Sequence, residues 1–326
     1  MLYRETFSLT LTQMLMIFSL ILVGFLLRKK NIVPENSGIT ISRIETFVLI
    51  PALIFHNQLT NCNIENFLAS SKLILCGLGL VLIAIIAACP LSTLFVKNSS
   101  QNREKAYQRN IYKYALTFGN STALGTFIVL GIWGDEMLFK HTMFNFFPIL
   151  LAFSWGLYVL IPKEYGEKSL LKNLKKGLTA PTVIALVAGI ICGLCDVGKF
   201  LPEFVMSALS NASNCMGPLA MILTGVVIGG YDFKSLWTNK KVYAVTFLRL
   251  IVIPAILVLA LKAMGMNDEI LTLALIAYAT PVGMNVIVYP ATYGGDTKTG
   301  ASMTIVSQML SVITIPIMYL LLIEVI

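Results

Sequence analysis

The sequence predicts an all-α polytopic membrane protein with ten transmembrane helices, arranged as two five-helix repeats of opposite orientation. Three observations support this class: an apolar composition, loop charges that alternate along the chain, and landmarks that recur half a chain apart. Of the 326 residues, 57% are hydrophobic and 12% are charged, and the mean hydropathy is +0.81. Soluble proteins have about 45–50% apolar and about 25% charged residues, so this composition excludes a soluble enzyme.

One membrane-spanning helix takes about 20 apolar residues, and a hydropathy window of about 19 residues finds the spans in order. They are expected near residues 8–27, 44–60, 73–96, 112–132, 137–161, 178–195, 205–230, 242–264, 269–292 and 300–325. The first is taken as a span and not as a signal peptide, because the basic residues Arg28, Lys29 and Lys30 follow its apolar run. The short connections leave no room for a sizeable domain outside the bilayer.

The charges of the loops test this number of spans. Ten spans place 17 Lys and Arg residues in the loops on one side of the membrane and 5 on the other. Cytoplasmic loops carry the excess of basic residues, so both termini are expected outside a cell membrane and the basic loops in the cytoplasm. The net charge of +8 is therefore explained by membrane topology, and no nucleic-acid partner is expected.

Several landmarks recur at an offset of about half the chain. Pro51 is matched by Pro218, Asn120 by Asn285, and Pro148 by Pro316. We therefore expect a first repeat at residues 1–162, a linker at 163–177 and a second repeat at 178–326. The linker is either an amphipathic helix on the cytoplasmic leaflet or a solvated connection. Because five is an odd number, the second repeat must enter the membrane inverted, which is a common plan of secondary transporters.

Each repeat contains one span with polar, helix-breaking residues at its centre. The candidate binding residues are Gly119, Asn120, Ser121 and Thr122 in the fourth span, and Thr280, Pro281, Val282, Gly283 and Asn285 in the ninth. Proline removes a helical hydrogen bond, so the ninth helix is expected to break between residues 280 and 283. Backbone groups freed in a membrane need protein or water as partners, so the two breaks should face each other. Their half-helix N-termini would suit a carboxylate. The alternative is that Asn and Ser join helices and that proline only kinks one.

Few ionisable residues lie within the predicted spans. His56 and Arg249 are candidates for charge or coupling roles. The alternatives are an interfacial histidine, and an arginine that pairs with a carbonyl or extends to the interface. No Asp or Glu lies at the centre of a span, so coupling to a proton or sodium ion would need other groups. The two histidines lie in separate segments, and the H-E-x-x-H and G-x-S-x-G motifs are absent. No enzyme activity, metal or cofactor is therefore expected.

Several stretches resemble the auxin efflux carrier family. They are Leu49-Ile-Pro-Ala-Leu-Ile-Phe55, Asn120-Ser-Thr-Ala-Leu-Gly125, Pro281-Val-Gly-Met-Asn285, Tyr293-Gly-Gly-Asp296 and a Ser-rich last span that ends at Pro316. The resemblance implies a fold like that of sodium/proton antiporters, with a scaffold of helices 1, 2, 6 and 7 and a transport domain of helices 3–5 and 8–10. It also implies homodimers through the scaffold, and a substrate carboxylate beside Asn120 and Pro281.

The function expected from these features is secondary transport of small organic anions, mono- or dicarboxylates, by alternating access. The family includes bacterial permeases for malate, malonate and related acids. The plant carriers' long central loop is absent, which favours the compact bacterial type in an inner membrane. A receptor or sensor without net flux and a sodium-coupled bile-acid-type symporter are the alternatives.

Overall fold

The computed structural model describes residues 2–97, 102–161, 175, 177–231 and 239–325, and all the regular secondary structure in these ranges is helical. The first part of the chain forms α1 (Leu2–Lys29), α2 (Ser37–Ile44), α3 (Ile50–Asn61), α4 (Ile64–Ala69) and α5 (Ser71–Phe95). A π-helical turn at Glu45–Leu49 joins α2 to α3 without a break. The predicted linker at 163–177 lies outside the described residues, apart from Lys175 and Gly177.

The middle of the chain contains shorter helices. They are α6 (Arg103–Thr117), the π-helical turn η2 (Ser121–Gly125), α7 (Thr126–Phe144), α8 (Phe146–Phe153), α9 (Trp155–Leu160), α11 (Pro181–Leu194) and the 3₁₀ turn η3 (Val197–Phe200). Gly134 interrupts α7 with a φ of 77°, a conformation that glycine adopts readily. The chain therefore changes direction between the fourth and fifth predicted spans.

The remaining helices are α12 (Glu203–Gly229), α14 (Lys240–Phe247), η4 (Leu248–Val252), α15 (Ile253–Ala263), α16 (Asp268–Ala279), α17 (Asn285–Thr292), α18 (Thr297–Tyr319) and η5 (Leu320–Val325). In the described ranges, seven helical stretches are long and apolar enough to cross a membrane, and two shorter apolar helices cover Phe146–Leu160 and Pro181–Leu194. The expectation of a multi-pass membrane protein is thus supported. The helices α6, α16 and α17 are each too short to cross a membrane alone, because the chain breaks beside them.

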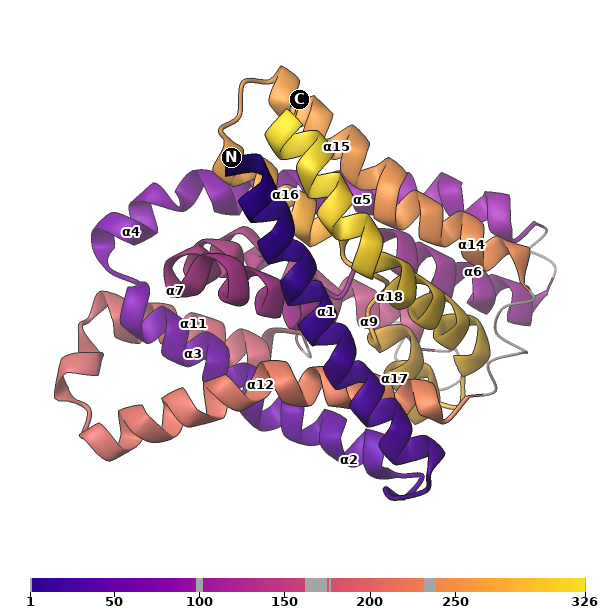
Figure 1. The fold of residues 1–326 in the computed structure, drawn as a ribbon, viewed down its shortest axis with the longest axis horizontal. Helices are drawn as coiled ribbons and strands as arrows, with labels where there is room; N and C mark the ends of the chain where they lie inside the picture. The colour runs from indigo at the N-terminus through magenta and orange to yellow at the C-terminus, as the bar shows by residue number, and fades with distance from the viewer. Residues whose placement is uncertain (1, 98–101, 162–174, 176, 232–238, 326) are drawn as a thin grey trace.

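The helices pack in two groups. In the first, α1 lies along α12, and α3 packs on both α11 and α12. In the second, α5 packs on α6, α15 on α16, and α14 and α17 on α18. Figure 1 shows α2, α3, α11 and α12 together, α5, α6, α14 and α15 on the opposite side, and α1 running across the molecule between them. Close approach of α1 and α12 depends on Gly24 and Gly225, where a Cβ atom would overlap backbone atoms of the facing helix.

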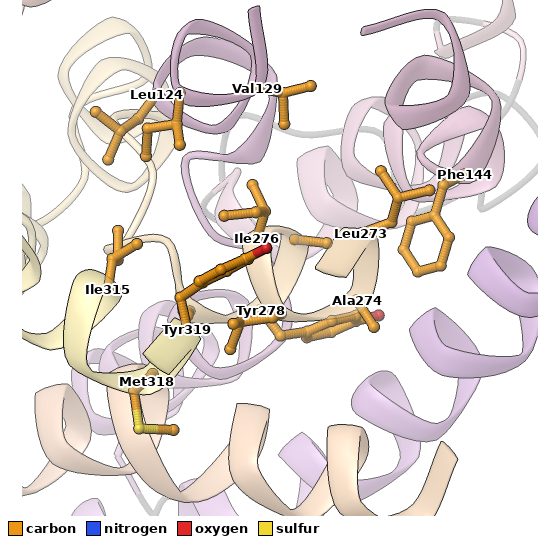
Figure 2. Packing of buried hydrophobic residues seen from close by; sticks show 14 of the residues in the cluster. Leu124, Val129, Phe144, Leu273, Ala274, Ile276, Tyr278, Ile315, Met318 and Tyr319 are labelled. Carbon is orange, nitrogen blue, oxygen red and sulfur yellow. The ribbon is translucent and has the colours of Figure 1, made fainter. Parts of the chain in front are cut away.

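The half-helix α16 lies at the centre of the molecule. All of residues 270–279 are buried, and Figure 2 shows Ile276 and Tyr278 of α16 among side chains such as Phe144 and Tyr319 of neighbouring helices. In contrast, apolar side chains such as Leu75 and Ile86 of α5 are exposed. This arrangement fits a bundle whose outer surface contacts lipid and whose centre holds a broken helix.

Candidate functional site

The two helix interruptions occur where the sequence predicts them, and they meet. The first separates α6, which ends at Thr117, from η2, and the second separates α16, which ends at Ala279, from α17. Gly119 and Val282 form an antiparallel bridge, and the Asn120 N–H donates a hydrogen bond of 2.7 Å to the Pro281 carbonyl. Backbone groups freed by one break are thus satisfied by the other, as a low-dielectric surrounding requires.

Local chemistry explains both breaks. In the second, Pro281 has no N–H, and the residue before it, Thr280, is extended with φ −67° and ψ 146°. The first contains no proline, and its key residue is Gly119. A Cβ atom at this position would overlap the Arg249 guanidinium and the Thr280 hydroxyl. Glycine therefore allows the two chains to cross this closely.

Arg249 binds the ends of both half-helices that lead into the crossing. Its side chain is 0% exposed and projects from η4. The guanidinium donates hydrogen bonds to four carbonyl oxygens: Leu116 (3.3 Å) and Thr117 (3.1 Å) at the end of α6, and Ala277 (3.2 Å) and Thr280 (3.3 Å) at the end of α16. It also lies 5.6 Å from the centre of the Tyr278 ring.

These bonds neutralise two helix C-termini with one cation. A helix C-terminus carries a partial negative charge on its free carbonyl groups, and here two such ends converge. Within the described ranges, no carboxylate forms an ion pair with Arg249. The guanidinium is therefore balanced by backbone dipoles, which is the carbonyl pairing that the sequence left open as an alternative for this residue.

The N-terminal ends of the helices that leave the crossing have backbone N–H groups without a protein partner. In the described structure, the backbone N–H groups of residues 121–123 at the start of η2 have no hydrogen-bond partner, whereas the Gly125 N–H donates to the Asn120 carbonyl at 3.0 Å. The N–H groups of residues 284 and 285 before α17 are likewise without a partner. Free N–H groups at a helix N-terminus attract anions, so the crossing offers two donor sets.

The predicted binding side chains differ in their contacts. Asn120 is 8% exposed, and its amide has no partner among the described residues. The Thr280 hydroxyl turns back to the Ala277 carbonyl at 3.3 Å. The Asn285 amide donates to the Tyr114 hydroxyl at 2.8 Å and so ties α17 to α6. The Val282 N–H donates to the Ser307 hydroxyl of α18 at 3.0 Å.

A polar cavity adjoins the first break, and its histidine was not predicted as a site residue. The cavity, which has room for about one water molecule, lies between α3 and the segment from η2 to α8. Its polar lining consists of Asn57, Thr122, Thr126, His141, Thr142 and Asn145. The sequence did contain a signal: a histidine and an asparagine four residues apart inside the span predicted at 137–161.

His56 lies in a different place. It borders an open hollow together with Met206, Ser207, Ser210 and Asn211 of α12, whereas its neighbour Asn57 lines the polar cavity. The structure therefore brings Arg249 to the crossing of the two breaks and leaves His56 on another face of α3. Among the described residues, no group of three or more His, Cys, Asp or Glu side chains could hold a metal ion.

Comparison with known proteins agrees with this architecture. The model of the membrane transport protein family matches residues 9–319. The chain is 24% identical to the uncharacterized transporter YfdV of Escherichia coli over 314 residues, which cover 93% of this chain and 95% of the relative. It is 23% identical to an uncharacterized transporter of Methanocaldococcus jannaschii over 305 residues, covering 92% and 95%. These names indicate a transporter and not an enzyme.

Proposed function

The chain belongs to the membrane transport protein family, the auxin efflux carriers that its sequence resembles, and from this premise we propose that it carries small organic anions across the membrane. The substrate is a mono- or dicarboxylate, and its carboxylate binds where the two broken helices cross. The observation that carries the proposal is that the helix C-termini at this crossing have a protein partner, whereas backbone N–H groups at the helix N-termini do not. Arg249 binds both C-termini, while the N–H groups of residues 121–123, 284 and 285 have no protein partner.

An anion is the ligand that this arrangement favours. Five N–H groups, at the start of η2 and before α17, have no protein partner, and the Asn120 amide adds further donor capacity at the first break. A cation would be repelled by the partial positive charge of these helix N-termini, and the partly negative C-termini are already bound by Arg249. The crossing thus selects for negative charge without placing a cationic side chain on the substrate.

The two groups of packed helices suggest how the substrate would be moved, with one group shifting against the other. We propose that the chain forms a ten-span inverted repeat in which α1, α2–α3, α11 and α12 are the scaffold. Predicted spans 3–5 and 8–10, which contain α5 to α9 and α14 to α18, form the moving transport domain. The polar cavity lies where α3 of the first group meets α7 and α8 of the second. Alternating access would open this boundary to one side of the membrane at a time. Homodimers through the scaffold, external termini and an inner-membrane location complete the proposal.

Uptake by proteoliposomes tests the function. Purified protein is reconstituted and offered radiolabelled acetate, lactate, malonate and malate, with and without proton and sodium gradients. We expect saturable uptake of at least one carboxylate. Asn120→Ala should weaken its apparent affinity roughly 10- to 100-fold, because a hydrogen bond to a charged group contributes about 1.5–3 kcal/mol. Asn211→Ala, at an exposed position of α12, is the matched control and should leave uptake unchanged.

The alternatives predict different results in the same experiment. Ligand-dependent thermal stabilisation without uptake would indicate a receptor. Uptake that requires a sodium gradient would indicate a sodium-coupled symporter. If none of the four carboxylates binds or is transported, and Asn120→Ala has no effect, the assignment of the crossing as an anion site is wrong.

A further inference from the structure

The polar cavity beside η2 contains a histidine that the anion site does not use. His141 is 1% exposed and lies on α7, facing the first residues of η2. Across the cavity, Asn57 of α3 is 3% exposed, donates its amide to the Asp135 carbonyl at 3.1 Å, and leaves its side-chain oxygen buried without a partner. An unsatisfied buried acceptor is costly, so the cavity is built for a polar occupant. As closed here, it has room for about one water molecule.

The imidazole of His141 is held only loosely. Its Nε2 lies 3.4 Å from the Ser121 hydroxyl and 3.3 Å from the Ser121 carbonyl, and both ring nitrogens lie 3.4 Å from the Asn145 amide nitrogen. Hydrogen bonds in proteins are usually near 2.9 Å. The Asn145 amide makes its shorter hydrogen bond, 2.8 Å, to the His141 carbonyl and not to the ring. One ring nitrogen therefore has no firm acceptor when it carries a proton.

The position of the ring couples it to the anion site. Ser121 is the first residue of η2, so the imidazole sits beside the N–H groups that would hold the carboxylate. With the site empty, the positive pole of η2 opposes a second positive charge on the ring. A bound carboxylate reverses this local field and supplies an acceptor. Proton uptake and anion binding must therefore strengthen each other, because coupling between two sites is reciprocal.

We propose that His141 takes up one proton from the adjoining water when a carboxylate binds at η2, so that anion and proton cross the membrane together. The inference rests on the proposed function and adds its coupling ion. It also explains how a transporter without a carboxylate at the centre of any span can use a proton gradient. After the transport domain moves, the anion leaves, the field of η2 returns, and the proton is released on the other side.

Other ionisable groups on the neighbouring elements do not take this role. Among the described residues, His141 is the only titratable side chain that lines the cavity. On its own helix, Lys140 pairs with Glu136 at 3.0 Å and with Glu269 of α16 at 2.7 Å. His56 of α3 faces the hollow beside α12. Other ionisable groups of the packed helices lie elsewhere. Cys76 of α5 and Tyr278 of α16 lie in the main hydrophobic cluster. The following are exposed: Asp135 of α7, Lys72 and Cys89 of α5, Asp268 of α16, and Glu203 and Cys215 of α12.

The first test is the pH dependence of malate binding to the full-length protein in detergent. Between about pH 6.5 and 8.5 the carboxylates of malate stay ionised, so a change in affinity reports on the protein. Uptake of one proton per anion raises the dissociation constant tenfold for each pH unit in the interval between the pKa of His141 in the empty protein and its pKa in the anion complex. We expect this dependence in the unaltered protein, its loss in His141→Gln, and its retention in His56→Gln. His56 is the matched control, because the chain has two histidines.

The second test needs no variant, so a misfolded His141→Gln would not block it. Proteoliposomes that contain the unaltered protein, an internal pH dye and equal potassium on both sides with valinomycin, which compensates the charge moved, are given an inward malate gradient, and their lumen should become acidic as malate enters. Malate uptake without acidification, or binding whose affinity is independent of pH, would overturn the proton coupling and leave the anion transporter standing. Absence of binding and uptake for malate, lactate and malonate alike would instead refute the proposed function, and the coupling with it.

Discussion

Replacing Arg249 by methionine tests whether one buried cation holds the crossing together. The substitution keeps an apolar stem of similar length and removes the donors to Leu116, Thr117, Ala277 and Thr280. The Ala277 carbonyl keeps a second donor, the Thr280 hydroxyl at 3.3 Å. The other three carbonyls lose the side-chain donor that the crossing gives them, at two helix ends that point toward each other.

The magnitude follows from these three acceptors. Each buried acceptor without a partner costs about 1–3 kcal/mol, and relief from burying a guanidinium offsets part of the sum. The three acceptors together cost about 3–9 kcal/mol before this offset, and we expect a net loss of stability of about 3–5 kcal/mol. Arg249→Lys keeps the charge but not the planar fork. With about two hydrogen bonds lost at about 0.5–1.5 kcal/mol each, it should cost about 1–3 kcal/mol.

Thermal unfolding in detergent and uptake into proteoliposomes measure the two consequences. The apparent unfolding temperature should fall in the order unaltered protein, Arg249→Lys, Arg249→Met, and the uptake rate should follow the same order. Arg43→Met, at an exposed position of α2, controls for the loss of a positive charge and should change neither measurement. An Arg249→Met variant that unfolds and transports like the unaltered protein would refute the view that this cation stabilises the two helix ends.

Two further substitutions examine the backbone of the crossing. Gly119→Ala adds a Cβ atom that overlaps Arg249, so it should cost about 1–3 kcal/mol and lower uptake, while Gly79→Ala, whose Cβ meets nothing within 4 Å, should be neutral or stabilising. Equal unfolding temperatures for the two variants would contradict the close approach at the crossing. Ser307→Ala leaves the Val282 N–H without its partner and should cost about 1–3 kcal/mol, whereas Ser311→Ala loses only a bond within its own helix. A larger shift for the second serine in the same thermal assay would speak against this role of the first.

The interruptions could be predicted from sequence because local chemistry causes them. Pro281 cannot donate a hydrogen bond and makes the preceding residue extended, and Gly119 allows close approach of another chain. The inference that the breaks face each other needed only the cost of free backbone groups in a membrane. The exact helix limits were less accessible. The turn at Gly134 falls in the gap between the spans predicted at 112–132 and 137–161, but the divisions of the second of these spans at Asn145 and Ser154 were not predicted.

The partners of buried polar side chains could not be predicted in the same way. Arg249 reaches carbonyls 133 and 132 residues away in the chain, as well as carbonyls 31 and 28 residues away. The sequence marks it as an unusual charge but does not say which helix ends converge on it. The cavity depends likewise on the packing of α3 against α7 and α8, which brings Asn57 opposite His141. Such contacts depend on the relative rotation of helices, which a single sequence does not encode in any local pattern.

The bonds of Arg249 also constrain how the proposed transporter distinguishes its substrates. If the guanidinium bound the carboxylate directly, it would have to release carbonyls at the ends of α6 and α16, and those acceptors would be left buried and unpaired. In the proposed site, Arg249 would therefore act on the anion through the backbone it holds in place, and N–H groups would recognise the carboxylate. Such groups bind any carboxylate in much the same way. Discrimination between one organic acid and another must then come from side chains around the rest of the molecule, and the polar cavity with Asn57 and His141 is the part of the described structure placed to provide it.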